Sequence, residues 1–235
     1  MDENGVVWAW GDNSFGQLGN NTLVNSNIPI AISSIDSVIK IGTGANHSFA
    51  IRNDGSLWVW GNNANGQLGT GGALFAMTPT QAPIIRNAID ATGGSMHSIC
   101  IDNKGRTYTW GDNTYGQLGD GSTTSNEIPL LITGLSNAKS VVAGHYNSFI
   151  QRNDKKIFCW GENSDGELGT DNTNSSLIPV RIENIHGVSS IAAGKNHLTT
   201  ILGYSTTCSS GNIAITVDTF QTAEIYNNGT TLSTV

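Results

Sequence analysis

Three histidines recur at a spacing that could support metal chemistry. His47 and His97 lie 50 residues apart, and His197 follows 100 residues later. In a fold that repeats around an axis, imidazoles at equivalent positions would form a ring of ligands for Zn²⁺ or a related ion. The fourth equivalent position holds Asn147, which breaks the ring. We therefore expect each hydroxyl or imidazole of the HS pair to satisfy buried backbone between strands, and we expect no metal.

Two other candidates for metal or redox chemistry are weaker. The segment NSDGE at 163–167 is similar to part of a calcium loop, but Gly161 stands where such a loop needs its first carboxylate. Cys100, Cys159 and Cys208 show no CxxC spacing and do not form an even set for disulfides. We expect no cofactor, and we expect Cys100 and Cys159 to be small core residues.

Composition and motifs argue against several functional classes. No Ser/His/Asp order, phosphate-binding glycine loop or paired-carboxylate pattern stands out, so we predict that the chain is not an enzyme. The chain has 11 basic and 18 acidic residues, a net charge of −7 and no basic run. Such a balance repels nucleic acid and anionic membranes. No apolar stretch predicts membrane insertion, which leaves a protein as the expected partner.

An internal repeat must position all of these residues. The decapeptide WGDNSFGQLG returns as WGNNANGQLG, WGDNTYGQLG and WGENSDGELG, each copy 50 residues after the last. A fixed period of this length predicts a repeat architecture. The period extends to a proline after each decapeptide. It also extends to a second recurring segment, which reads GANHSFAI in one copy and AGKNHLTTI in another. The shared residues that we assign to the fold are Trp10, Trp60, Trp110, Trp160, Gly16, Gly66, Gly116, Gly166, His47, His97 and His197.

The runs between these landmarks predict short strands. SVIKIG, HSFAIR and SLWVW are rich in β-branched and aromatic residues and are bounded by Gly, Asn, Asp or Pro. We count roughly four strands per repeat, which is typical of a β-propeller blade. The expected fold class is therefore all-β, with four repeats forming four-stranded propeller blades.

Two features inside each repeat have a predicted structural role. Aromatic residues two positions apart, such as Trp8 with Trp10, point to the same face of a strand, and we expect them to wedge between neighbouring sheets as core. Asn13 and its equivalents are expected to set a turn through backbone hydrogen bonds, while Gly16 and its equivalents take positive φ. Leu18 and its equivalents then re-enter the core.

The decapeptide, the proline and the AGxxHS segment together resemble the regulator of chromosome condensation repeat family, over roughly residues 3–202. The resemblance implies a propeller of about seven blades, so these repeats are expected to be part of a larger ring. Strand counting leaves a second arrangement open, in which the amino-terminal strands complete the last blade of a four-bladed ring. Family functions include guanine-nucleotide exchange on a small GTPase, chromatin binding, ultraviolet sensing and β-lactamase inhibition, and the fold does not choose among them.

Particular residues of this chain argue for or against some of these family functions. The resemblance implies that the ultraviolet-sensing member of the family carries light-sensing tryptophans between the glycine and the histidine of the AGxxHS segment. This chain has no tryptophan there. The strict 50-residue register leaves no room for the β-wedge that the family's account of nucleotide exchange includes. Chromatin binding in the family uses a basic tail, and this sequence contains no basic run. The residues between glycine and histidine are Ala45 and Asn46, Ser95 and Met96, His145 and Tyr146, and Lys195 and Asn196.

Binding should involve positions that differ between copies, because the shared positions are committed to the fold. One set is the dipeptide just described, at what we expect to be one rim of the propeller. The other is the segment between decapeptide and proline, which is notably apolar in one copy. Tyr and Met are common contact residues. The candidate partner-binding residues are Asn46, Met96, His145, Tyr146, Lys195, Leu74 and Phe75.

The chain divides into repeats at 1–202 and a polar tail at 203–235, in which NIAITV and AEIYN are possible strands of another β domain. We predict a non-catalytic protein-interaction module. Guanine-nucleotide exchange on a small GTPase and a purely structural spacer are the alternatives. Low charge with abundant Asn, Ser and Thr resembles bacterial surface proteins, which favours an extracellular or cell-surface location over the cytoplasm. The oligomeric state is left open.

Overall fold

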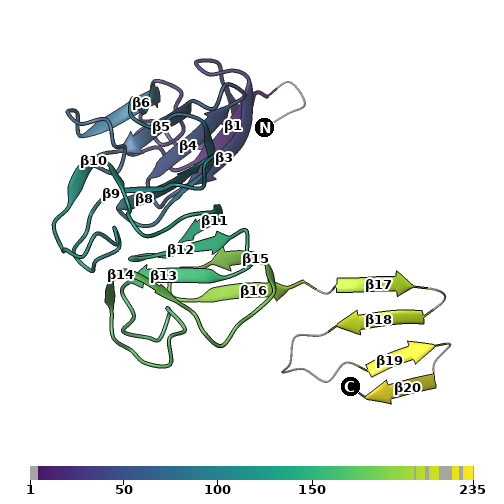
Figure 1. Cartoon of the computed structure of the whole chain (residues 1–235). Coiled ribbons are helices and arrows are strands. Elements are labelled where there is room, and N and C mark those ends of the chain that lie inside the picture. Colours follow the sequence, from purple (N-terminus) through teal and green to yellow (C-terminus); the bar gives the residue numbers. More distant parts are fainter. Residues whose placement is uncertain (1–4, 204, 210–211, 217–223, 228–229, 235) are drawn as a thin grey trace.

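The computed structural model of the chain shows an arc of antiparallel β-sheets (Figure 1). The structure describes residues 5–203, 205–209, 212–216, 224–227 and 230–234. No helix long and apolar enough to span a membrane occurs among these residues.

Three sheets of four strands each are complete propeller blades. Blade 1 contains β3 (Val38–Thr43), β4 (His47–Arg52), β5 (Leu57–Asn62) and β6 (Phe75–Gln81). Blade 2 contains β7 (Ala88–Gly93), β8 (His97–Asp102), β9 (Thr107–Gly111) and β10 (Asn126–Leu131). Blade 3 contains β11 (Ala138–Ala143), β12 (Asn147–Arg152), β13 (Ile157–Gly161) and β14 (Ser176–Arg181). The predicted four-stranded blades are confirmed.

Two half-blades flank the complete ones. The leading half-blade pairs β1 (Val7–Gly11) with β2 (Ser26–Ile32), which correspond to the third and fourth strands of a blade. The trailing half-blade pairs β15 (Val188–Ala193) with β16 (Leu198–Leu202), which correspond to the first and second strands. The two half-blades are separate sheets among the described residues, so the alternative of a closed four-bladed ring is wrong. The arc is part of a larger propeller.

The tail contains two hairpins. They are formed by β17 (Ser205–Ser209) with β18 (Asn212–Thr216), and by β19 (Glu224–Asn227) with β20 (Thr230–Thr234). The assignment of this segment to another domain stays a prediction, and the side chain of Cys208 lies outside the described residues.

The hydrophobic core lies between blades. One cluster joins Phe49 and Leu57 of blade 1 to Cys100 and Trp110 of blade 2, and similar clusters join blade 2 to blade 3 and blade 3 to the trailing half-blade. The first strands of successive blades contact one another. Each blade therefore covers the apolar face of its neighbour, as expected for stacked repeats.

The tryptophan of each complete blade is inserted into the preceding blade. Trp60, Trp110 and Trp160 are at most 2% exposed. The Nε1–H of Trp110 donates a 2.8 Å hydrogen bond to the carbonyl of Gln67, the eighth residue of the preceding decapeptide. Its indole lies against Gly69, where a Cβ would come within 2.8 Å of Nε1. Trp60 on Gly19 and Trp160 on Gly119 repeat this geometry, so the last decapeptide glycine is a seat for the next tryptophan.

The same carbonyl accepts a second hydrogen bond from the next blade. Ser98 Oγ donates to the carbonyl of Gln67 at 2.7 Å. The Nε2 of His47 lies 3.0 Å from Ser98 Oγ. Because the serine proton is used on the carbonyl, His47 must donate from Nε2. Equivalent bonds join Ser48 to Gln17, Ser148 to Gln117 and His97 to Ser148. We call the carbonyl, its tryptophan and its serine the inter-blade clamp.

Asn147 breaks the histidine series for a local reason. At the junction between blade 3 and the trailing half-blade, Leu198 stands where the other junctions have serine. A histidine at position 147 would therefore have no hydroxyl to meet, and Asn147 Nδ2 instead faces the carbonyl of Glu162 at 3.4 Å. The expectation that the hydroxyls of the HS pair meet buried backbone is confirmed. The imidazoles of His47 and His97 differ, because each bonds a serine hydroxyl of the next blade. No group of three His, Cys, Asp or Glu side chains placed to hold a metal occurs among the described residues.

The decapeptide turn follows its prediction. The side-chain oxygen of Asn113 accepts the backbone N–H of Leu118 at 2.9 Å, and Gly116 has φ of +79°. The other three copies have the same bond and a positive φ at the same glycine. Leu118 is fully buried. This rigid turn places the clamp carbonyl.

The aromatic pairs depart from their prediction at two positions. Trp10 is 62% exposed and Trp8 43% exposed, although we expected both in the core. The reason is that a tryptophan seat belongs to the preceding blade, and no described residue provides one for Trp10. In the complete blades the first aromatic packs beneath an arginine, as where Arg52 lies 5.9 Å from the ring centre of Trp58.

Burial of the histidines makes stability depend on pH. Burial lowers the pKa of His47 to about 3 and the pKa of His97 to about 4. An unfolded histidine titrates near 6.5, so between pH 6.5 and 4 the unfolded chain binds protons that the folded chain excludes. The free energy of unfolding is therefore highest above pH 6.5 and falls as the pH drops toward 4.

Replacing His97 by asparagine should weaken this pH dependence. His97→Asn removes one titrating group and uses the residue found at the equivalent position 147. The loss of unfolding free energy between pH 6.5 and 5 should become shallower by up to about 1.4 kcal/mol per pH unit. Urea denaturation at a series of pH values measures it. His186→Asn, at an exposed position, is the control, and equal slopes for His97→Asn and the unmodified chain would contradict the account.

Candidate protein-binding rim

Loops at one end of the blades carry both sets of variable residues. The backbone N–H of Asn62 donates to the carbonyl of Asn46 at 2.8 Å, and the next N–H, of Asn63, donates to the carbonyl of Leu74 at 2.7 Å. Asn62 also pairs with Phe75 across the sheet. The dipeptide and the segment before the proline thus lie at the same end of the propeller, which we call the rim.

The dipeptides are linked to one another across blades. The N–H of His145 donates to the carbonyl of Lys195, and the N–H of Ser95 donates to the carbonyl of His145, both at 2.9 Å. Ala45 donates in the same way to Gly94 at 3.0 Å. These bonds run from blade 1 to the trailing half-blade, so the variable side chains stand on a continuous hydrogen-bonded support.

Three rings of the rim stack into one cluster. The ring centre of Tyr146 lies 4.0 Å from that of His145 and 4.8 Å from that of Tyr115. Tyr115 is 40% exposed, whereas His145 and Tyr146 are half-buried. Stacked aromatic side chains that expose part of their surface lose little conformational entropy on binding, which suits them to protein contacts.

Tyr115 is a candidate residue that the sequence analysis missed. It occupies the sixth position of the decapeptide, a segment assigned wholly to the fold. That position differs between copies, with Phe15, Asn65, Tyr115 and Asp165. The same neighbour relation recurs one blade later, where Asn196 Nδ2 donates to Asp165 at 3.0 Å. This difference between copies is the sequence signal that could have identified Tyr115 as a candidate.

The other predicted residues are distributed along the rim. Met96 is 38% exposed, Lys195 is exposed and Asn46 is half-buried. Leu74 and Phe75 are 69% and 41% exposed, but they lie just before and at the start of β6, the outer strand of blade 1, away from the cluster between blades 2 and 3. The structure therefore groups His145, Tyr146 and Tyr115, and separates Leu74 and Phe75 from them.

The electrostatics of the rim are mixed. Partial burial lowers the pKa of His145, and the positive charge of Lys195 lowers it further, against the opposing effect of Glu162. His145 is therefore neutral at pH 7, and the rim combines a neutral aromatic cluster with single charges of either sign. Such a surface does not provide the dense positive charge that nucleic acid requires.

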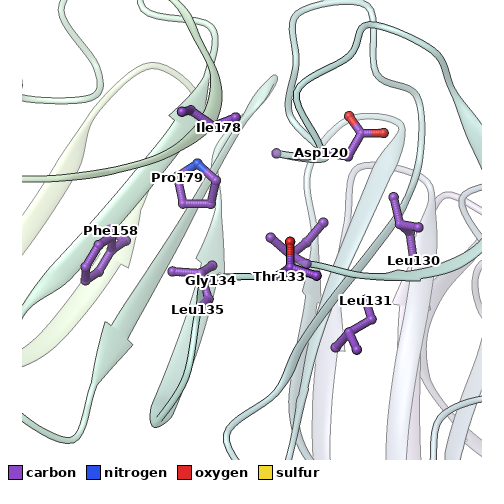
Figure 2. A pocket seen from close by; sticks show the side chains of 11 residues that line it. Asp120, Leu130, Leu131, Thr133, Gly134, Leu135, Phe158, Ile178 and Pro179 are labelled. Atoms are coloured by element: carbon purple, nitrogen blue, oxygen red, sulfur yellow. The ribbon is translucent and has the colours of Figure 1, made fainter.

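A groove also lies between blades 2 and 3. Its volume is about 560 Å³, and Figure 2 shows Phe158, Ile178 and Pro179 on one side and Leu130 and Leu131 on the other. The carboxylate of Asp120 lies at its edge, where it accepts hydrogen bonds from Ser122. The lining is mostly apolar, and it brings together no acid and base pair.

The two described cysteines are structural. Cys100 and Cys159 are fully buried and free, as expected. Burial raises the pKa of Cys159 to about 12 and raises that of Cys100 well above its ordinary value. Both side chains are thus protonated thiols, which are poor nucleophiles.

The propeller and its repeats place the chain in a known family. The family model of the RCC1-like domain matches residues 1–200, and the chain belongs to this family. This confirms the resemblance to regulator of chromosome condensation repeats.

Solved propellers share the fold. Human WBSCR16 is 22% identical, with a TM-score of 0.78 over 86% of this chain and 55% of that one. Prp20p from Saccharomyces cerevisiae is 23% identical, with a TM-score of 0.77 over 85% of this chain and 52% of that one. Yeast RCC1 (Prp20) bound to Kap60 gives 22% identity and a TM-score of 0.75, over 83% and 49% of the two chains. The chain spans about half the length of these structures, and the similarity establishes the fold.

Removing one charge of the rim should shift the titration of His145. Lys195→Met should raise the pKa of His145 and Glu162→Gln should lower it, because these charges respectively oppose and favour the imidazolium. NMR titration of the imidazole measures both shifts. Lys104→Met, in the loop between β8 and β9 at the opposite end, is the control. An unchanged pKa in both rim variants would contradict the proposed arrangement.

Proposed function

We propose that this chain is a non-catalytic module that binds a protein through its rim. The observation that carries the proposal is the stacked cluster of Tyr115, Tyr146 and His145. It stands at positions that vary between otherwise similar repeats. Because backbone hydrogen bonds between blades hold the cluster in place, binding would require little reorganisation.

We expect the partner to present a surface that combines apolar and polar groups and is not strongly charged. Met96 and the aromatic rings offer apolar contact area, while Lys195 and Glu162 can fix orientation through single ion pairs. We also propose that the module belongs to a bacterial surface or secreted protein, which its low charge and abundant Asn, Ser and Thr support.

Regulation of a small GTPase is the second candidate. Prp20p, which shares this fold, was characterised for its binding properties to Gsp1p and histones. At 23% identity this similarity supports a regulatory interaction only as an alternative. Release of a fluorescent guanine nucleotide from a panel of small GTPases distinguishes it, because a rim that only binds leaves the release rate unchanged.

Removing the aromatic cluster should abolish partner capture. Tyr115→Ala with Tyr146→Ala removes two stacked rings, and about tenfold or greater loss of affinity is expected for such contacts. The immobilised chain and the variant would be compared for proteins retained from the lysate and culture medium of the native organism, followed by affinity measurement on any protein identified.

The matched control is Arg86→Ala with Lys104→Ala, two exposed positions in loops at the opposite end of blades 1 and 2. Circular dichroism must show equal folding of all three proteins. A partner retained by the unmodified chain and the control, but lost by the rim variant, supports the proposal. Equal retention by all three proteins would exclude this cluster as the site, and no retained protein at all would favour a structural spacer.

A further inference from the structure

The groove between blades 2 and 3 is a second concave surface, separate from the candidate residues of the rim. Its walls come from the outer strands of the two blades, β10 and β14, and from the turn that follows β10 (Figure 2). None of the candidate rim residues lines it. Both blades are complete four-stranded sheets, so the groove lies between finished parts of the fold.

The residues that line this groove are not shared by the other junctions. Between blades 2 and 3 the walls carry Leu131 and Ile178, and Asp120 lies at the edge. In the 50-residue register, the corresponding residues are Gln81, Ile128 and Thr70 between blades 1 and 2, and Ala31, Thr78 and Asn20 between the leading half-blade and blade 1. Two large apolar walls with a carboxylate at their edge occur together at one of these three junctions. The blade fold therefore does not require this combination.

The turn after β10 leaves the groove open. Gly134 belongs to this turn, and a Cβ added to it would have no described atom within 4 Å. Ile84 stands at the equivalent position of the preceding repeat. Pro179 on the wall is half-buried, whereas its equivalents Pro79 and Pro129 are buried. The surface between blades 2 and 3 is thus accessible to a ligand.

The walls expose large apolar side chains to solvent. Leu131 is 44% exposed and Ile178 is 56% exposed, and they lie on opposite sides of the groove (Figure 2). Leu130 and Phe158 are half-buried beside them. Removing such facing apolar surfaces from water is favourable, so the walls favour an apolar occupant.

Asp120 gives the groove a single charge that has no counterion among the described residues. The side chain is exposed, and the ion pairs found in the described part of the chain do not include it. Its carboxylate accepts hydrogen bonds from neutral groups, which are Asn113 Nδ2 at 3.1 Å and the backbone N–H of Ser122 at 2.9 Å. A free carboxylate at the edge of an apolar groove is complementary to a positive group on the occupant.

The outer strands themselves are protected against the addition of another strand. Pro129 in β10 and Pro179 in β14 have no N–H to donate, and proline is a common guard of strand edges. An occupant is therefore held through its side chains, in the space between the strands. The lining follows six consecutive residues, 130–135, which suits an extended chain better than a compact molecule.

We propose that this groove binds a short extended segment of another protein, which carries two large apolar side chains next to a lysine or arginine. The apolar side chains of the segment pack against Leu131 and Ile178, and its basic side chain pairs with Asp120. The net charge of −7 of this chain adds to the attraction of a basic segment. This surface is additional to the rim, and the proposal does not depend on the function proposed for the rim.

A random peptide library displayed on phage, selected against the immobilised chain, tests the proposal. We expect the enriched peptides to contain two large apolar residues beside a lysine or arginine. Fluorescence anisotropy of the enriched peptide, synthesised with a label, then measures its affinity for the chain and for its variants.

Replacing the apolar walls should weaken this peptide. Leu131→Gln with Ile178→Thr introduces the residues found at the equivalent positions 81 and 78. The dissociation constant should rise at least about tenfold, because the peptide loses both apolar contacts. Both positions are exposed, so the fold is retained, which circular dichroism verifies. Ile128→Thr makes the same change between blades 1 and 2, and as the matched control it should leave the affinity unchanged.

Asp120→Asn removes the charge and keeps the turn. Asn20, at the equivalent position, accepts bonds from Asn13 Nδ2 and from the backbone N–H of Thr22, as Asp120 does from its own neighbours. The variant should bind the basic peptide several-fold more weakly, and high salt should bring the unmodified chain to the same affinity. A peptide with glutamine in place of its basic residue should bind both proteins equally.

Specific outcomes would overturn the proposal. One is a selection that enriches no peptide, and another is a peptide that binds the Leu131→Gln, Ile178→Thr variant as tightly as the unmodified chain. Enriched peptides without a basic residue, or equal affinity for Asp120→Asn, would overturn the proposed partner chemistry. A peptide lost by Tyr115→Ala with Tyr146→Ala but kept by the groove variant binds the rim, which would support the rim and overturn the groove as the site.

Discussion

The fold depends on one backbone carbonyl in each of the first three decapeptides, which accepts two hydrogen bonds from the next blade. The carbonyl of Gln67 receives Trp110 Nε1–H and Ser98 Oγ–H, both in the buried space between sheets. A buried carbonyl left without donors costs about 1 to 3 kcal/mol, so each clamp favours one relative placement of neighbouring blades. The asparagine and glycine of the decapeptide matter because they fix where this carbonyl points.

The clamp also separates residues that build the propeller from residues free to vary. Tryptophan, serine and the last decapeptide glycine make the contacts between blades. The sixth decapeptide position and the dipeptide before the histidine lie at the rim, where side chains from the two positions can meet across the junction between blades. Tyr115 and Tyr146 meet in this way, and so do Asp165 and Asn196. One scaffold can therefore present different chemistry on each blade without a change in its core.

Much of this architecture could be predicted from the sequence, because the information is local. The 50-residue period, the four strands, the turn at Asn113 and the buried Cys159 follow from spacing, alternation and turn chemistry. The contacts between blades could not be predicted, since they join residues 31 to 51 positions apart whose proximity depends on blade geometry. For that reason we predicted from the sequence that Trp10 lies in the core and that the imidazoles bond to backbone groups. For the same reason we overlooked Tyr115. A blade begins two strands before its decapeptide, because the decapeptide starts in the third strand of the sheet.

A double-mutant cycle on one carbonyl tests the clamp most directly. Ser98→Ala and Trp110→Phe each leave Gln67 with one donor, whereas the double variant leaves its buried carbonyl with neither. The account predicts that the double variant loses more unfolding free energy than the two single variants together, by about 1 kcal/mol. Ser148→Ala combined with Trp110→Phe, which act on different carbonyls, should be additive. Additivity for the Ser98 and Trp110 pair would contradict the clamp as the interaction that joins the blades.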